Sequence, residues 1–283
     1  MQYVSFQSLG EIGNMCSQMQ QFASLCAVAS ETGHEIRLPE SSKSRGFGIR
    51  MFDLLDVEPQ YEPDEFFQGF KRFRLNEKTR VDDRVFGLDS SYSYFVDGRF
   101  DLFTYWYPKH AQHVLGWNIR PQFVEKANEF IRRVKDSYET NVRVVAMHIR
   151  LGDYLLPEHH HFVRLWQTDY YTKAMQVITE KHEHVKFLIF SNDIKWCREN
   201  LLPDSSDEDF VDTKDDCLDF AIMASCDDII IANSSFSLWA AFMNKNPDKT
   251  IVCPTQYLYE YSEFSHINGN YYPNDWTSIN MEL

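Results

Sequence analysis

The sequence predicts an α/β protein in which two domains each contain a parallel sheet. In the second half, apolar strands are expected at 142–147, 186–190, 228–232 and 250–252, with helical patterns at 169–184, 215–225 and 235–244. Strands that alternate with helices in this way form a parallel sheet covered by helices on both faces. At 283 residues the chain is long enough for two domains of this kind.

The first half begins with a strand at 3–6, a turn around Gly10 and Gly13, and a helix. The helix is expected because apolar residues recur along one face, and these are Met15, Met19, Phe22, Ala23 and Cys26. A short strand near 35–38 completes a βαβ unit. The segment 40–110 has only weak periodicity.

A helix at 120–136 is expected to join the halves, and Pro121 suits its first turn. We therefore expect an N-terminal domain at 1–137 and a C-terminal domain at 138–283.

Composition excludes several classes of protein. The net charge of −14 argues against a nucleic-acid or membrane-surface binder, whereas an anionic small ligand needs only a few local donors. The six cysteines form no C-x-x-C pair, which fits reduced thiols and argues against zinc. The first residues lack a basic signal region, and no stretch of the chain has 18 consecutive apolar residues. We therefore expect a cytoplasmic protein without a transmembrane segment.

The strongest motif is VVAMHIRLGDY, an apolar strand that ends in charged residues. His148 and Arg150 share one face of the strand, because side chains alternate with period two. Gly152 permits a turn, which holds Asp153 close by. Arginine suits a diphosphate because its planar fork donates two parallel hydrogen bonds. The alternative is a structural ion pair between Arg150 and Asp153.

A second motif, Asn233-Ser234-Ser235-Phe236, follows an apolar strand and opens a helix. Backbone N–H groups at a helix N-terminus can bind phosphate, although simple capping of the helix is the alternative.

A third motif, Ser191-Asn192-Asp193, also follows a strand. These side chains are suited to hydrogen bonds with a nucleoside or to capping of a helix near Ile194. The G-x-x-G sequence at 10–13 is a weak indication of a close backbone approach to phosphate.

The order of GEIGNMCSQMQQFA, DGRFDLFTYW, HIRLGDY, FLIFSND and DDCLDFAIMASCDDIIIANSSFSLWAAF resembles the α-1,2-fucosyltransferase family (glycosyltransferase family 11-like). The resemblance implies a GT-B-like architecture, with two Rossmann-like domains and a cleft between them. It implies that the C-terminal domain binds GDP-fucose and the N-terminal domain serves the acceptor. It also implies that no metal or other cofactor is needed.

The resemblance also implies roles for individual residues. Arg150 would bind the diphosphate, and Ser234, Ser235 and Phe236 would hold the phosphates from the other side. The remaining expected donor-binding residues are Asn14, His148, Ser191, Asp193, Asp219 and Asn233, and the resemblance implies that Asp193 and Asp219 would lie near the nucleoside. The family pattern carries a second arginine where this chain has Leu151. Adjacent strand residues face opposite ways, so Leu151 is expected to alter a neighbouring contact rather than the position of Arg150.

The implied reaction is an inverting transfer of L-fucose to a hydroxyl of an oligosaccharide acceptor, expected to be O2 of a terminal β-galactose. The candidate bases are Asp153, Glu158 and His161, in that order. The alternatives are another nucleotide sugar, another linkage, or an inactive glycan-binding relative. The histidines at 159–161 and the seven acidic residues in 204–216 lack the ligand spacing of a metal site.

Overall fold

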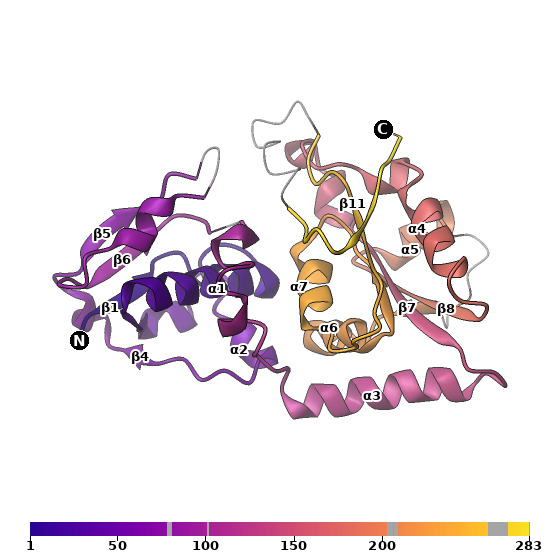
Figure 1. Ribbon diagram of the computed structural model, residues 1–283, viewed down its shortest axis with the longest axis horizontal. Coiled ribbons are helices and arrows are strands. Elements are labelled where there is room, and N and C mark those ends of the chain that lie inside the picture. The colour runs from indigo at the N-terminus through magenta and orange to yellow at the C-terminus, as the bar shows by residue number, and fades with distance from the viewer. Residues whose placement is uncertain (78–80, 101, 203–205, 207–208, 260–270, 283) are drawn as a thin grey trace. The chain divides into compact units, whose positions relative to one another are not determined.

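The computed structural model describes residues 1–77, 81–100, 102–202, 206, 209–259 and 271–282. The chain forms two compact units, Met1–Arg120 and Pro121–Leu283 (Figure 1). Each unit contains a sheet whose strands pair in parallel, so the α/β prediction is confirmed.

The first unit contains a four-stranded parallel sheet in the order β2-β1-β6-β5, and β3 and β4 form a separate parallel pair. Its elements are β1 (Tyr3–Phe6), α1 (Met15–Thr32), β2 (Glu35–Ile36), β3 (Leu38–Pro39), α2 (Met51–Leu54), β4 (Tyr61–Glu62), β5 (Lys71–Arg74) and β6 (Tyr94–Asp97). Strands β1 and β2 flank α1 and pair in parallel, which confirms the predicted βαβ unit.

Helix α1 is buried on more than the predicted apolar stripe. Met19 and Ala23 are fully buried as expected, but Gln18 is fully buried as well. Its amide donates to Gly48 O at 2.8 Å and accepts from Arg50 N at 2.7 Å, so its burial leaves both polar atoms satisfied. A buried glutamine of this kind breaks the apolar periodicity from which the helix face was predicted.

The second unit contains a six-stranded parallel sheet in the order β12-β11-β10-β7-β8-β9. Its elements are α3 (Pro121–Asp136), β7 (Arg143–Ile149), α4 (Tyr170–Thr179), β8 (Val185–Ser191), α5 (Ile194–Asn200), β9 (Phe210–Val211), α6 (Asp216–Ser225), β10 (Asp228–Ile230), α7 (Ser235–Met243), β11 (Ile251–Pro254) and β12 (Thr277–Ile279). Helix α4 ends at Thr179, before the predicted 184, because 180–184 holds no apolar residue to bury and the chain must turn before β8.

Helices cover both faces of this sheet, as the central strand β7 shows. Val145 and Met147 pack with Tyr170 of α4 on one face. His148 points to the other face, where it contacts the first turn of α7. In Figure 1, α4 and α5 accordingly lie on one side of β7 and β8, with α6 and α7 on the other.

Helix α3 belongs to the second unit, so the division between the compact units falls at 120/121 rather than at the expected 137/138. The helix buries Phe123, Ala127 and Ile131 and packs against α6. Near its end, Lys135 forms an ion pair of 2.8 Å with Asp227. An amphipathic helix must bury its apolar face, and the sequence alone does not say against which domain.

Candidate functional site

The predicted site residues of the second unit gather where its central strands end. Strands β10, β7 and β8 are parallel neighbours, in the register Met147 with Ile230 and Ile149 with Ser191. The segments that follow them therefore meet at the carboxyl edge of the sheet. In open parallel α/β sheets, ligands bind at this edge.

His148 joins the end of β7 to the first turn of α7. Its side chain is 4% exposed, and its Nδ1 shares a hydrogen bond of 2.8 Å with Ser237 Oγ. Burial, and secondarily the charge of Arg150, lowers the pKa of His148 from 6.5 to about 3. The imidazole is therefore neutral at physiological pH, and it connects two elements that both carry predicted donor-binding residues.

We expect this buried histidine to make the protein less stable in acid. Between pH 6.5 and about 3 the unfolded chain binds a proton that folded His148 does not, so the free energy of unfolding falls as the pH falls. From pH 7 to pH 5 the loss from this group is about 2 kcal/mol. Urea unfolding at pH 7 and pH 5 would measure this loss. The free energy of unfolding of His148→Asn should fall by about 2 kcal/mol less than that of the native protein. Equal pH dependence of the native protein and His148→Asn would contradict the account.

Arg150 follows β7 and is paired with Asp153. Arg150 Nη2 lies 2.6 Å from Asp153 Oδ1, and the guanidinium carbon lies 5.5 Å from the centre of the Tyr154 ring. The side chain of Arg150 is 22% exposed and that of Asp153 is 40% exposed, so the pair is only partly open to solvent, and Asp153 Oδ1 itself is buried. The structural ion pair considered as an alternative is thus present, and diphosphate binding by Arg150 stays a prediction.

At the N-terminus of α7, one residue caps the helix and the next two are only half-buried. Ser234 is the N-cap, and its Oγ accepts from Phe236 N at 3.4 Å. Ser235 and Phe236 are half-buried at the start of the helix. Asn233 is buried and donates to the backbone carbonyls of Val163 and Tyr257, at 2.9 and 3.0 Å. Its amide therefore connects α7 to the loops at Val163 and Tyr257. This structural role was not part of the predicted donor binding.

The expected nucleoside-binding residues lie at the end of β8, at the N-cap of α5 and in the first turn of α6. Asp193 caps α5 by accepting from Trp196 N at 3.0 Å, and Ser191 Oγ accepts from Asp193 N at 3.1 Å. Asp219 accepts from Thr213 N and Thr213 Oγ1, at 3.0 and 2.8 Å. Burial raises the pKa of Asp219 above its ordinary value. The contact of these residues with a nucleoside stays a prediction.

Asn14 lies in the first unit, after the glycine turn. Its Oδ1 accepts from Ser17 N at 3.4 Å and caps α1. The turn before it is closely packed, because Gly10 has a φ of +85° and a Cβ there would lie 2.8 Å from Ser42 O. This close packing accounts for Gly10 without a phosphate, and the reach of Asn14 to a donor stays a prediction.

The three candidate bases differ in environment. Asp153 is held by Arg150, whereas Glu158 is exposed on a short 3-10 turn, Pro157–His159. His161 is half-buried, and burial followed by the charges of His159 and His160 lowers its pKa. All three lie on one segment after β7, but only Asp153 is joined directly to Arg150.

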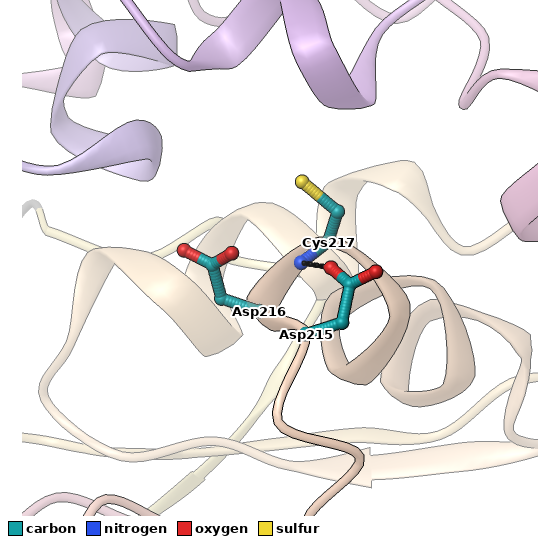
Figure 2. Close-up of side chains that lie close together, drawn as sticks. All are labelled: Asp215, Asp216 and Cys217. Atoms are coloured by element: carbon teal, nitrogen blue, oxygen red, sulfur yellow. Dashed lines mark hydrogen bonds between the residues drawn. The ribbon is translucent and has the colours of Figure 1, made fainter. Parts of the chain in front are cut away.

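One group of possible metal ligands occurs among the described residues. The ligand atoms of Asp215, Asp216 and Cys217 lie within 4.8 Å of one another (Figure 2). The carboxylate of Asp215 accepts from Cys217 N at 3.0 Å and from Leu218 N at 3.3 Å, so it caps α6. Capping explains the closeness of these groups. Residues 204, 205, 207 and 208 of the acidic segment lie outside the described residues.

Sequence reasoning did not predict the hydrogen bonds that connect the site. Ser237 partners His148, and Tyr154 donates its hydroxyl proton to Asn233 O at 2.8 Å. Asn192 accepts from Leu151 N at 2.8 Å. The one available signal was position, because Asn192 directly follows β8 as Arg150 directly follows β7.

Residues 8–280 match the family described as Glycosyl transferase family 11. This match places the chain among the glycosyltransferases. More narrowly, the chain belongs to glycosyl transferase family 11, and the resemblance seen in the sequence is confirmed.

Curated relatives agree with this membership, and a solved structure agrees with the fold. The O-antigen biosynthesis glycosyltransferase WbnK of Escherichia coli is 32% identical over 123 residues, which are 42% of this chain and only 40% of that protein. Galactoside alpha-(1,2)-fucosyltransferase 1 of Saimiri sciureus is 28% identical over 292 residues, covering 97% of this chain and 74% of that protein. The crystal structure of POFUT1 in complex with GDP-fucose has a TM-score of 0.51 at 12% identity, covering 89% of this chain and 98% of that chain. The fold is therefore GT-B-like, as expected.

Within the described part of the chain, no helix has the length and apolar character required to cross a membrane.

Proposed function

We propose that the protein transfers L-fucose from GDP-fucose to O2 of a terminal β-galactose in an oligosaccharide, with inversion at the anomeric carbon. The observation that carries the proposal is the His148–Ser237 hydrogen bond of 2.8 Å. It holds the strand end that bears Arg150 beside the N-terminus of α7. A guanidinium next to a helix N-terminus is complementary to a diphosphate. Membership of glycosyl transferase family 11, and relatives named as galactoside α-(1,2)-fucosyltransferases, support the choice of sugar and linkage.

Arg150 and the first turn of α7 would stabilise the departing GDP. As the bond to fucose breaks, negative charge develops on the diphosphate. A fixed guanidinium and the N-terminus of α7 at Ser235 favour that charge electrostatically, while the N–H of Phe236 is bound to Ser234 Oγ. Since these groups supply the positive charge, we propose that the reaction needs no metal ion. Asp219 and Asp193 are proposed to face the nucleoside.

Leu151 does not weaken the proposed donor site. It is fully buried in the core with Tyr154 and Val163, whereas Arg150 is partly exposed. An arginine side chain at this position would have to leave the core. The leucine therefore affects the packing of the core rather than the position of Arg150. We therefore retain GDP-fucose as the donor rather than another nucleotide sugar.

We propose Asp153 as the base that accepts the acceptor's proton. It is the candidate whose position is fixed by an ion pair, which its carboxylate forms with Arg150. Glu158 and then His161 are the next candidates, and both lie further along the same segment.

Asp153→Asn is expected to lower kcat by about 100-fold or more, because a positioned base contributes at least this factor. Glu158→Gln should change kcat by less than about 3-fold, because Glu158 is exposed. Steady-state kinetics between pH 5 and 9 would measure both variants. A larger loss in Glu158→Gln than in Asp153→Asn would reassign the base.

The linkage is tested by incubating the protein with GDP-fucose and a panel of β-galactosides, with and without EDTA. NMR of the product should show an α-1,2 linkage formed equally well in both arms. A product with another linkage would replace the proposed acceptor atom. Loss of activity in EDTA would refute the metal-free mechanism, and binding of glycan without any turnover would favour an inactive glycan-binding relative.

A further inference from the structure

The backbone beside Arg150 is bound by a side chain that follows the neighbouring strand. Strands β7 and β8 end at the same edge, and the residue after β8 is Asn192. The backbone N–H of Leu151, which follows Arg150, donates to Asn192 Oδ1 at 2.8 Å. Because a backbone N–H can only donate, the amide oxygen must face Leu151. The orientation of the amide is therefore determined, and Nδ2 lies on the side of Gly152.

Gly152 packs directly on this amide. Its φ is +61°, in the left-handed region, and a Cβ built on it would lie 2.2 Å from Asn192 Nδ2. No other residue type fits between the turn and the amide without a shift of one of them. Two features therefore favour glycine at position 152: its positive φ and its close packing against Asn192.

Arg150 and Asp153 lie on either side of the two residues that contact Asn192. Arg150 precedes Leu151 and Asp153 follows Gly152, and the two charged side chains meet at 2.6 Å. Oδ1 of Asn192 holds the peptide N–H between them, and Nδ2 lies against the next residue. The position of the amide therefore sets the position of the backbone from which both Arg150 and Asp153 project.

We propose that Asn192 is a positioning residue for fucosyl transfer, acting through the turn at 151–152 to place Arg150 against the departing diphosphate. This inference rests on the proposed function. Asn192 itself is exposed, so water can replace its hydrogen bond when the side chain is removed. Its loss should therefore alter the geometry of the turn far more than the stability of the unit.

Asn192→Ala is expected to lower kcat for GDP-fucose by about 10- to 100-fold, the range that a displacement of a charged group by about 1 Å produces. KM should change by less than about 3-fold, because the interaction affected is made mainly in the transition state. The melting temperature should fall by less than about 3 °C. Steady-state kinetics and thermal unfolding of the same preparations measure the three quantities.

Asn200→Ala is the matched control. Asn200 is also exposed in the second unit, and it also makes one side-chain bond to the backbone, donating to Trp196 O at 3.0 Å. It is the last residue of α5, and its side chain bonds within that helix. Its loss should leave kcat unchanged within about 2-fold. An equal loss of kcat in both variants would show a general effect of weakened structure and would overturn the inference.

A double-mutant cycle with Arg150→Ala tests whether Asn192 acts through Arg150. If it does, Asn192→Ala should lower kcat by less than about 2-fold when Arg150 is already absent. A full 10-fold or greater further loss would show that the two residues act independently, and would overturn the inference. Normal kcat in Asn192→Ala with an active native protein would do the same. No turnover of GDP-fucose by the native protein would instead overturn the proposed function, and this inference with it.

Discussion

Arg150→Ala is expected to lower kcat/KM for GDP-fucose by about 100-fold or more, the usual cost of removing one pre-positioned electrostatic donor. The substitution removes the guanidinium and also leaves the carboxylate of Asp153 without its partner at 2.6 Å. That carboxylate would then repel the diphosphate. Steady-state kinetics with a saturating galactoside acceptor would measure the effect, and thermal unfolding would confirm that the variant is folded.

Three further variants separate the causes of this loss. Arg150→Lys keeps the charge but not the planar fork, so its activity should lie between those of the native protein and Arg150→Ala. Arg150→Ala combined with Asp153→Asn removes the repulsion and should bind GDP better than Arg150→Ala alone. Arg132→Ala, at an exposed position on α3, should be fully active. Activity of Arg150→Ala within about 3-fold of the native protein would remove Arg150 from the donor site.

Arg143→Ala is expected to lower the free energy of unfolding of the second unit by about 3 kcal/mol. Asp228 is fully buried, and Arg143 donates to both of its carboxylate oxygens, at 2.7 and 2.9 Å. Removing one partner of a buried pair costs about 3–5 kcal/mol, because the remaining charge is left without compensation. The lower end applies here, since Thr250 N and the nearby His182 remain beside the carboxylate.

Urea unfolding monitored by circular dichroism would measure this loss. Arg133→Ala is the matched control, because Arg133 and Glu129 are 68% and 56% exposed and 4.0 Å apart. An exposed pair contributes less than about 0.5 kcal/mol, so this variant should unfold as the native protein does. Equal stability of the two arginine variants would contradict the role given to the buried pair.

The second sheet could be predicted because its strands are buried on both faces and therefore appear as continuous apolar runs. Residues 144–149 of β7 are all buried, and the expected strand lies within two residues of the observed ends. The first sheet gives no such pattern. Its strand β5 reads Lys-Arg-Phe-Arg and is mostly exposed at the edge of the sheet, while β2 has only two residues. Short and exposed strands of this kind are defined by pairing with neighbours, which the sequence does not record.

The sequence predicts at which edge of the sheet the candidate site residues lie, but it does not predict the hydrogen bonds between them. The motif around Arg150 and the motif at Ser234 each follow an apolar strand, and parallel strands place both at one edge. The hydrogen bonds of His148 with Ser237, and of Leu151 with Asn192, join residues 89 and 41 positions apart. No local pattern predicts such contacts, because they depend on which strands become neighbours and on which face each side chain points.

The central proposal is that the carboxyl edge of the second sheet binds GDP-fucose as the sugar donor. The most direct test is the initial rate of nucleotide release by the purified protein with GDP-fucose, GDP-mannose and UDP-galactose, each with a β-galactoside acceptor. The account predicts turnover with GDP-fucose, and a loss of that turnover in Arg150→Ala. Turnover with a non-fucose donor alone would contradict it.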